Sequence, residues 1–317
     1  MSHPPELLRG LTRTERPNAE AQMQPTAPFR SWHAGEEAAR LNTPDEFAVR
    51  ALGALLGSVD AALPSGSWHL KGSAALLAWC GPGARMPEDV DLSLAEEAAG
   101  RLLAPGALPP PAPGTEVRIV RSEKMVFSRS GRAPVHRALA HVEAAGLSVD
   151  VTLNLSLAPD STAYSDTRTG GLHFPTGPEP QGVPAATFGR CLAQKLLRYT
   201  LPRSGGRIAT RWTDLLDFLV CASSSRAPEL GLTALRADVA AELKAVDRGW
   251  PALPVPPAEW LDFWDAAMFR YGLPYGRLAD AVDRAGAFWE PVLADGSDGA
   301  GADARTWDPA SWAWATQ

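Results

Sequence analysis

Alternation of apolar and polar positions is clearest in LSVDVTLNLSL, residues 147–157. Apolar side chains occupy one face and polar ones the other, namely Val149, Val151, Leu153 and Leu155 against Asp150, Thr152 and Asn154. A period of two residues predicts a half-buried strand. Shorter segments of this kind, SWHLKGS (67–73) and EDVDLSL (88–94), predict two more strands, and EVRIV with MVFSR (116–129) predicts a strand pair or one long strand.

Helical spacing marks one N-terminal segment and most of the chain after residue 183. In TPDEF, Thr43 can cap a helix, Pro44 suits its first position and Glu46 completes a capping box. Apolar residues then recur at helical spacing as far as Leu63. The run AALLAWC (74–80) predicts a short buried helix. Further helices are predicted at 184–200, 209–223, 232–246, 257–272 and 275–293.

The order of these elements predicts an α/β (α+β) N-terminal half followed by a helical C-terminal half. We expect a disordered extension at residues 1–30, because it is rich in proline and polar residues. An α/β domain should then occupy residues 31–180 and a helical domain residues 181–317. The tail WDPASWAW (307–314) should pack onto the helical half.

Composition narrows the class of protein. The chain has 317 residues, of which 45% are hydrophobic and 21% charged, as in globular proteins with one or two cores. A net charge of -6 gives no global attraction to nucleic acid, so any such attraction must come from local patches. Three widely spaced cysteines argue against a disulfide framework and fit a reducing compartment. Without a long apolar run or a signal-like N-terminus, we expect a cytoplasmic protein with no membrane span.

Two aspartates separated by one residue are the first sign of chemistry. Asp89 and Asp91 would share one face of a strand, where their like charges repel unless a cation or a proton intervenes. Upstream, Gly72 and Ser73 lie at a strand-to-helix turn, where backbone N–H groups and a hydroxyl can bind a phosphate. A phosphate-binding turn beside two carboxylates indicates a Mg²⁺ site. Asp150, on a neighbouring strand, is a candidate third acid that would hold a second metal or take a proton from an attacking hydroxyl.

The segment LKGSAALLAW…GARMPEDVDLSL resembles the nucleotidyltransferase signature of the AbiEii/AbiGii toxin family. The matching positions are Lys71, Gly72, Ser73, Arg85, Asp89, Asp91 and Leu92. A second motif of that family resembles residues 192–218, which supply Lys195, Arg198, Arg211, Asp214 and Asp217 in the expected order. The resemblance covers residues 45–220.

The resemblance implies a Mg²⁺-dependent, polymerase-beta-like nucleotidyltransferase of a type IV toxin–antitoxin system. Such an enzyme would transfer NMP from an NTP to an RNA acceptor such as the tRNA 3′ end, release pyrophosphate, and have a cognate antitoxin protein. Asp89 and Asp91 would hold Mg²⁺. Lys195 would offer a charge to the triphosphate, and Asp214 would orient Lys195 or take a proton from the nucleophile. The remaining matches, Lys71, Gly72, Ser73, Arg85 and Asp217, would bind the nucleotide.

Three functions stay open at this point: an RNA-directed toxin, a small-molecule nucleotidyltransferase of the antibiotic-modifying type, and a non-catalytic nucleotide- or partner-binding protein. Clustered basic residues favour the first. One cluster comprises Arg118, Arg121, Lys124, Arg129, Arg132 and Arg137; the other comprises Arg190, Lys195, Arg198, Arg203, Arg207 and Arg211. We expect both to flank the carboxylates and to contact an RNA backbone. The alternative is that these residues pair with acids of the C-terminal helices.

Overall fold

A computed structural model of the chain describes residues 44–81, 84–85, 87–104, 106–125, 135–144, 146–157, 182–200, 212–261, 264, 276–294 and 304–316. The chain divides into two compact units. We call residues 25–82 and 86–187 the sheet unit, and residues 1–24, 83–85 and 188–317 the helical unit. The predicted extension at 1–30 lies outside the described residues.

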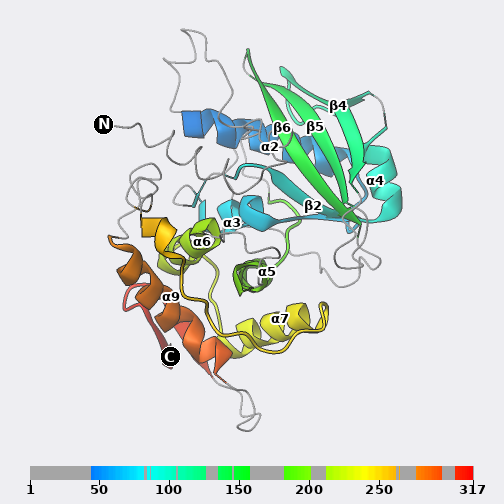
Figure 1. Ribbon diagram of the computed structural model, residues 1–317. Helices are drawn as coiled ribbons and strands as arrows, with labels where there is room; N and C mark the ends of the chain where they lie inside the picture. The colour runs from blue at the N-terminus through cyan, green and yellow to red at the C-terminus, as the bar shows by residue number, and fades with distance from the viewer. Residues whose placement is uncertain are drawn as a thin grey trace. The chain divides into compact units, whose positions relative to one another are not determined.

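A six-stranded sheet forms the centre of the sheet unit, with strand order β1-β2-β6-β5-β4-β3 (Figure 1). The strands are β1 (Trp68–Lys71), β2 (Val90–Leu94), β3 (Ala107–Leu108), β4 (Thr115–Met125), β5 (Val135–Ala144) and β6 (Leu147–Leu157). Neighbouring strands are antiparallel except β2 and β6, which are parallel. The helices of this unit are α2 (Pro44–Ala62), α3 (Gly72–Cys80) and α4 (Glu96–Leu102). The predicted mixed α/β class is confirmed.

The core of the sheet unit lies on the apolar face of the sheet. The four apolar residues predicted to share one face of β6 are all buried. Helix α2 packs on β4 and β5, and α4 packs on β6, so these helices cover that face (Figure 1). Leu52, Leu55 and Leu56 of α2 are completely buried, as the helical spacing predicts. The opposite face of the sheet therefore carries the polar side chains.

Strand β5 was not predicted, although it lies in the middle of the sheet. It pairs with β4 on one side and with β6 on the other along its whole length. Its inward positions are Ala138, Ala140 and Val142, all buried. Two alanines give little hydrophobic contrast and have low strand propensity, so the alternation of VHRALAHVEA is weak. Pairing with two long neighbours overrides this local preference.

The free edge of β1 is partly covered by residues 184–186. Leu70 donates its N–H to Pro184 O at 2.8 Å and accepts one from Ala186 N at 2.9 Å. The indole Nε1 of Trp79, on α3, donates to the carbonyl of Ala186 at 2.9 Å. These bonds fix β1 and the helix that follows it, and with them the turn at Gly72.

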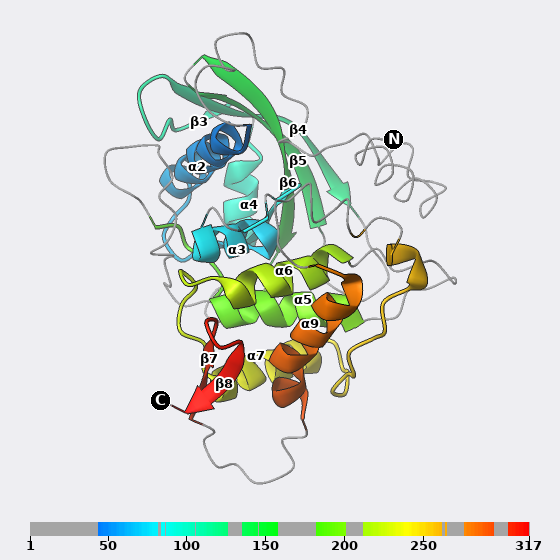
Figure 2. The ribbon, with the colours of Figure 1, turned by 90° about the vertical axis from the view of Figure 1, so that its left-hand side faces the viewer.

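Four helices and a β-hairpin make up the described part of the helical unit (Figure 2). They are α5 (Phe188–Thr200), α6 (Trp212–Ser223), α7 (Leu232–Lys244), α9 (Leu278–Leu293) and the strands β7 (Arg305–Asp308) and β8 (Ala313–Thr316), with a short 3-10 turn η5 (Ala258–Trp260). Helix α5 packs against α6 and α7, and α9 packs against the same two helices, α6 and α7 (Figure 2). Among the helices described in either unit, none is long and apolar enough to cross a membrane.

Aromatic side chains fill the core of the helical unit. Phe218 and Trp289 meet edge to face with ring centroids 5.1 Å apart, and Phe288 and Trp307 do so at 4.8 Å. The indole of Trp307 also donates to Ala222 O, at 2.7 Å, which ties the hairpin to α6. The C-terminal tail therefore packs onto the helices, as predicted, but as a β-hairpin.

Candidate functional site

The predicted aspartate pair is held together by an amide. Asp91 is on β2, whereas Asp89 lies in the bend just before that strand. The Asn154 side chain donates from Nδ2 to Asp89 Oδ2 at 2.6 Å and to Asp91 Oδ1 at 3.2 Å. All three side chains are half-buried. Two donated hydrogen bonds offset part of the repulsion between the carboxylates, and each bond engages one oxygen of an aspartate.

Glycine is required at position 72 for two reasons. Gly72 begins α3 with φ +69°, in the left-handed region that favours glycine. In addition, a Cβ at this position would overlap the carboxylate of Asp91. The turn that starts α3 therefore brings backbone directly against Asp91, whereas the sequence pattern predicted that the close approach would be to a phosphate.

A row of polar residues crosses the sheet at this level. Asp91 lies opposite Lys71 on β1 and opposite Asn154 on β6, and Asn154 lies opposite Arg137 on β5. The Lys71 ammonium donates to the hydroxyl of Ser156 at 2.7 Å. Ser73 is half-exposed in the first turn of α3. We call Lys71, Gly72, Asp89, Asp91, Arg137 and Asn154 the carboxylate cluster. The sequence pattern did not predict Asn154 as a member, and it predicted Arg137 beside the carboxylates only as part of a basic cluster that contacts RNA.

The register of the strands places Asp150 away from the aspartate pair. This residue shares a face of β6 with Asn154, but it lies four residues earlier, or about 13 Å along the strand. Its carboxylate is bonded to His141 Nδ1 at 2.7 Å, and Glu143 accepts from Nε2 of the same ring at 3.2 Å. The bond to Asp150 raises the pKa of His141, as does the one to Glu143, against a lowering by burial. Asp150 thus belongs to a separate polar group.

The second predicted motif forms a buried ion cluster in the helical unit. Lys195 Nζ on α5 lies 2.6 Å from Asp217 Oδ2 and 3.3 Å from Asp214 Oδ1, both on α6. Arg85 donates to both oxygens of Asp217, from Nε at 3.0 Å and from Nη2 at 3.1 Å. The side chains of Lys195, Asp214 and Asp217 are 2%, 1% and 4% exposed. Arg85 and Asp217, predicted to contact nucleotide, are instead bonded to each other inside this cluster.

Charge balance keeps Asp217 ionised in spite of its burial. Burial alone would raise the pKa of this carboxyl, but the charges of Arg85 and Lys195, with their hydrogen bonds, outweigh it and lower the pKa to about 2. Nearby, burial and the charge of Asp214 raise the pKa of Tyr199 to about 12. Two cations and two carboxylates give the four-residue cluster no net charge.

Most described members of the predicted basic clusters pair with nearby acids. Arg118 contacts Glu116 and Glu143, and Arg121 contacts Glu123. In the helical unit Arg190 bonds to Glu242 of α7 at 2.7 Å. For Arg190 the structure therefore shows the alternative role, pairing with an acid of the C-terminal helices. Arg198 lies 3.8 Å from Asp214 and is half-exposed. Arg129, Arg132, Arg203, Arg207 and Arg211 lie outside the described residues.

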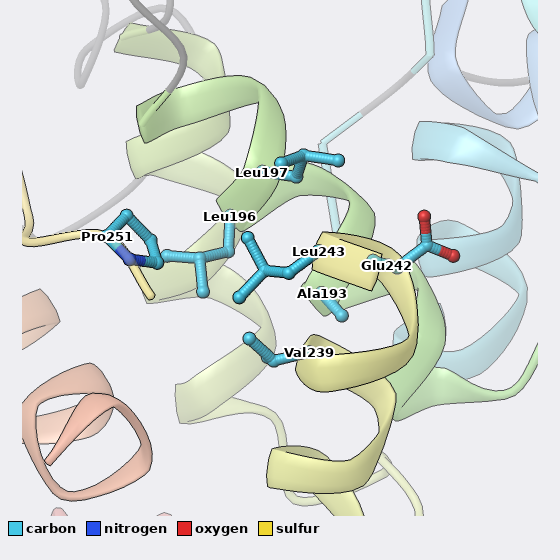
Figure 3. A pocket seen from close by; sticks show the side chains of 7 residues that line it. All are labelled: Ala193, Leu196, Leu197, Val239, Glu242, Leu243 and Pro251. Atoms are coloured by element: carbon cyan, nitrogen blue, oxygen red, sulfur yellow. The ribbon is translucent and has the colours of Figure 1, made fainter. Parts of the chain in front are cut away.

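The seam between α5 and α7 is not a ligand site. Its hollow is lined by Ala193, Leu196, Leu197, Val239, Glu242, Leu243 and Pro251 (Figure 3). The space between these side chains does not admit a water molecule. Glu242 points away from the apolar residues, and its carboxylate accepts from Arg190 and Gln194 instead (Figure 3). The seam is a packed helix contact with a polar cross-link at its edge.

We predict that Gly72→Ala destabilises the protein by about 1–3 kcal/mol, because alanine is strained at this φ and its Cβ meets Asp91. The matched control is Gly100→Ala on α4, where no atom lies within 4 Å of the added Cβ. That variant should be neutral or stabilised by up to about 1 kcal/mol. Urea unfolding measures both. Equal stabilities for the two variants would show that the turn at Gly72 is not constrained as described.

A second prediction concerns acid stability. The native pKa of Asp217, about 2, is below its ordinary value of 3.8, so its stabilising contribution is complete above that value and is lost as pH falls towards 2. Asp217→Asn should cost about 3–5 kcal/mol near neutral pH, because it leaves buried cations uncompensated. The difference in unfolding free energy between parent and variant should narrow below about pH 4. Asp283→Asn, at an exposed position on α9, controls for the loss of an acid. If the difference in unfolding free energy between the parent and Asp217→Asn did not change with pH, the lowered pKa of Asp217 would be contradicted.

Comparisons with known proteins place both motifs in one family. The family model described as "Nucleotidyl transferase AbiEii toxin, Type IV TA system" matches residues 54–270, which is more than half of the chain. Among solved structures, the chain is similar to the nucleotidyltransferase toxin MenT4 of Mycobacterium tuberculosis H37Rv, with 17% identity, a TM-score of 0.43, and coverage of 81% of this chain and 94% of that one. It is also similar to JHP933 of Helicobacter pylori, with 15% identity, a TM-score of 0.44, and coverage of 80% and 93%. No curated protein matches the chain. The chain belongs to the AbiEii family of type IV toxin–antitoxin nucleotidyltransferases.

Proposed function

We propose that this nucleotidyltransferase binds Mg²⁺ at Asp89 and Asp91 and transfers NMP from an NTP to an RNA acceptor, such as the tRNA 3′ end, with release of pyrophosphate. The observation that carries this proposal is the carboxylate cluster. Two half-buried carboxylates converge on one amide beside the N-terminus of a helix, with a glycine that admits close approach. Carboxylates beside a phosphate-binding turn suit a metal-bound triphosphate.

The donor set fits Mg²⁺ that arrives with its nucleotide. Nucleotidyltransferases of this family generally use a divalent metal. Within the described residues, no group of three or more His, Cys, Asp or Glu side chains could hold a metal. Two carboxylates are nevertheless sufficient for Mg²⁺, which takes its other ligands from phosphate oxygens and water. When bound, the metal would neutralise negative charge on the triphosphate as pyrophosphate leaves.

Phosphate recognition in the sheet unit is assigned to the start of α3. The first N–H groups of a helix have no partner within the helix, and the helix dipole favours an anion there. Gly72 and Ser73 occupy these positions on α3. Lys71 precedes them on β1, in register with Asp91, and adds a positive charge beside the turn. We assign these three residues to the phosphates of the NTP.

In the helical unit, we assign Lys195 as a cation for the phosphates and Asp214 as the residue that orients it. Lys195 already has two carboxylate partners, so a phosphate oxygen could replace Asp214, the more distant one at 3.3 Å. Asp217 and Arg85 would meanwhile keep the ammonium in place. The side chains of Lys195 and Asp214 are 2% and 1% exposed, so a phosphate reaches Lys195 only when this cluster opens. The contact between Asp214 and Lys195 supports the orienting role of Asp214 over proton transfer from an acceptor hydroxyl.

The acceptor of the nucleotide is a separate question from the reaction itself. RNA is what the family resemblance implies, and the membership of a type IV system implies an antitoxin partner and an NTP. Pairing of Arg118, Arg121 and Arg190 with acids weakens the argument from surface charge. A cationic small molecule of the antibiotic type is therefore the competing acceptor, and both belong in one assay.

The test is incubation with each labelled NTP, Mg²⁺, and either total RNA or an aminoglycoside, followed by electrophoresis and thin-layer chromatography. We expect label in RNA of tRNA size. Asp89→Asn and Asp91→Asn should lower transfer by about a hundredfold or more, because each removes a metal ligand. Asp150→Asn is the matched control and should keep near-parental transfer. Transfer that survives in both Asp89→Asn and Asp91→Asn would contradict the metal assignment. Label in the aminoglycoside alone would show that the acceptor is a small molecule and not RNA.

A further inference from the structure

Asn154 occupies the place on β6 that faces the aspartate pair. It is directly opposite Asp91 in the parallel register, and its amide is the group that touches both carboxylates. An amide has a donor end and an acceptor end. Only the Nδ2 end can bond to two carboxylates, because Oδ1 would face them with like partial charge. The value of Asn154 to this pair therefore depends on which way its amide points.

Arg137 reinforces that direction from the other end of the amide. It lies opposite Asn154 on β5, and its Nε donates to Asn154 Oδ1 at 3.4 Å. The guanidinium has donors but no acceptor, so it can bond only to the oxygen end of the amide. With Oδ1 held by Arg137, Nδ2 must face Asp89 and Asp91. The order of contacts is guanidinium, amide, then the two carboxylates, across three adjacent strands.

We propose that Arg137 and Asn154 are positioning residues that hold the two carboxylates in the geometry for metal binding before any metal arrives. The proposal rests on the proposed function, since it concerns the same metal. Asn154 engages one oxygen of each aspartate and reduces the repulsion that would otherwise drive the carboxylates apart. Arg137 acts on the metal only through Asn154. A metal then meets ligands that are already oriented, which reduces the cost of binding.

A different role for Arg137 is direct attraction of a phosphate or of RNA by its charge. Two substitutions separate the roles. Arg137→Gln puts an amide nitrogen the same number of bonds from the backbone as Nε, so it restores the donor without the charge. Its amide can bond to Asn154 only by donating to Oδ1, because Nδ2 already donates to the two aspartates. Arg137→Met places a methyl group there and removes both. Arg118→Met is the matched control, because Arg118 lies opposite His141 on the same sheet face and is bonded to Glu116 and Glu143.

The experiment measures the affinity of the full chain for Mn²⁺ alone, by electron paramagnetic resonance of the free ion, with thermal unfolding in parallel. Arg137→Met should weaken Mn²⁺ binding by about two- to tenfold, as expected for one hydrogen bond, whereas Arg137→Gln and Arg118→Met should stay close to the parent. Asn154→Leu should weaken binding by about tenfold or more, since two donated bonds are lost. In the Asn154→Leu background, Arg137→Met should have no further effect.

Each outcome has a separate meaning. Mn²⁺ binding that is unchanged in Asp91→Asn would refute the assignment of the metal to Asp89 and Asp91, which is the part of the proposed function on which this inference rests. If the parent binds and the effects of Arg137→Met and Asn154→Leu add, Arg137 does not act through Asn154. Equal losses in Arg137→Met and Arg137→Gln would show that charge, not orientation, is what matters. If Asn154→Leu proves unfolded, the comparison of the two Arg137 variants still decides.

Discussion

Repulsion between the carboxylates of Asp89 and Asp91 is the constraint around which the sheet unit is arranged. Asn154 offsets it by donating to both, and Gly72 leaves room for Asp91 beside the start of α3. Both contacts depend on register, which places Asp91 opposite Lys71 on one side and Asn154 on the other. A slip of one residue would turn these side chains to the opposite face of the sheet. The apolar face packed under α2 thus fixes the polar face as well.

The helical unit solves a related problem by burial. Four ionised groups in a core cost more desolvation than an apolar cluster of similar volume, so stability alone is a poor reason for them. What the cluster achieves is a single position for Lys195, which lies between two aspartates of α6 while Arg85 occupies both oxygens of Asp217. An ammonium held in this way is oriented in advance, which supports the role proposed for it with phosphates.

Periodicity predicted the helices and strands that bury one apolar face. It failed for features that depend on pairing with other segments of the chain. The apolar alternation of residues 147–157 gave β6 with its buried face, and capping signals placed the start of α2 at Pro44. Strand β5 was missed because alanines supply its inward face. Asp150 and Asn154 share one face of β6, and only pairing with β2 decides which of them meets Asp91. The burial of Lys195 was equally out of reach, because its partners come from other segments.

The most direct test of the account is a crystal structure of the protein with Mn²⁺ and a non-hydrolysable NTP analogue, with the metal located by its anomalous scattering. The account predicts a Mn²⁺ peak bonded to carboxylate oxygens of both Asp89 and Asp91 and to phosphate oxygens of the analogue, with Asn154 Nδ2 still bonded to the aspartates. A metal held elsewhere in the chain, or a triphosphate bound without contact to either aspartate, would contradict it.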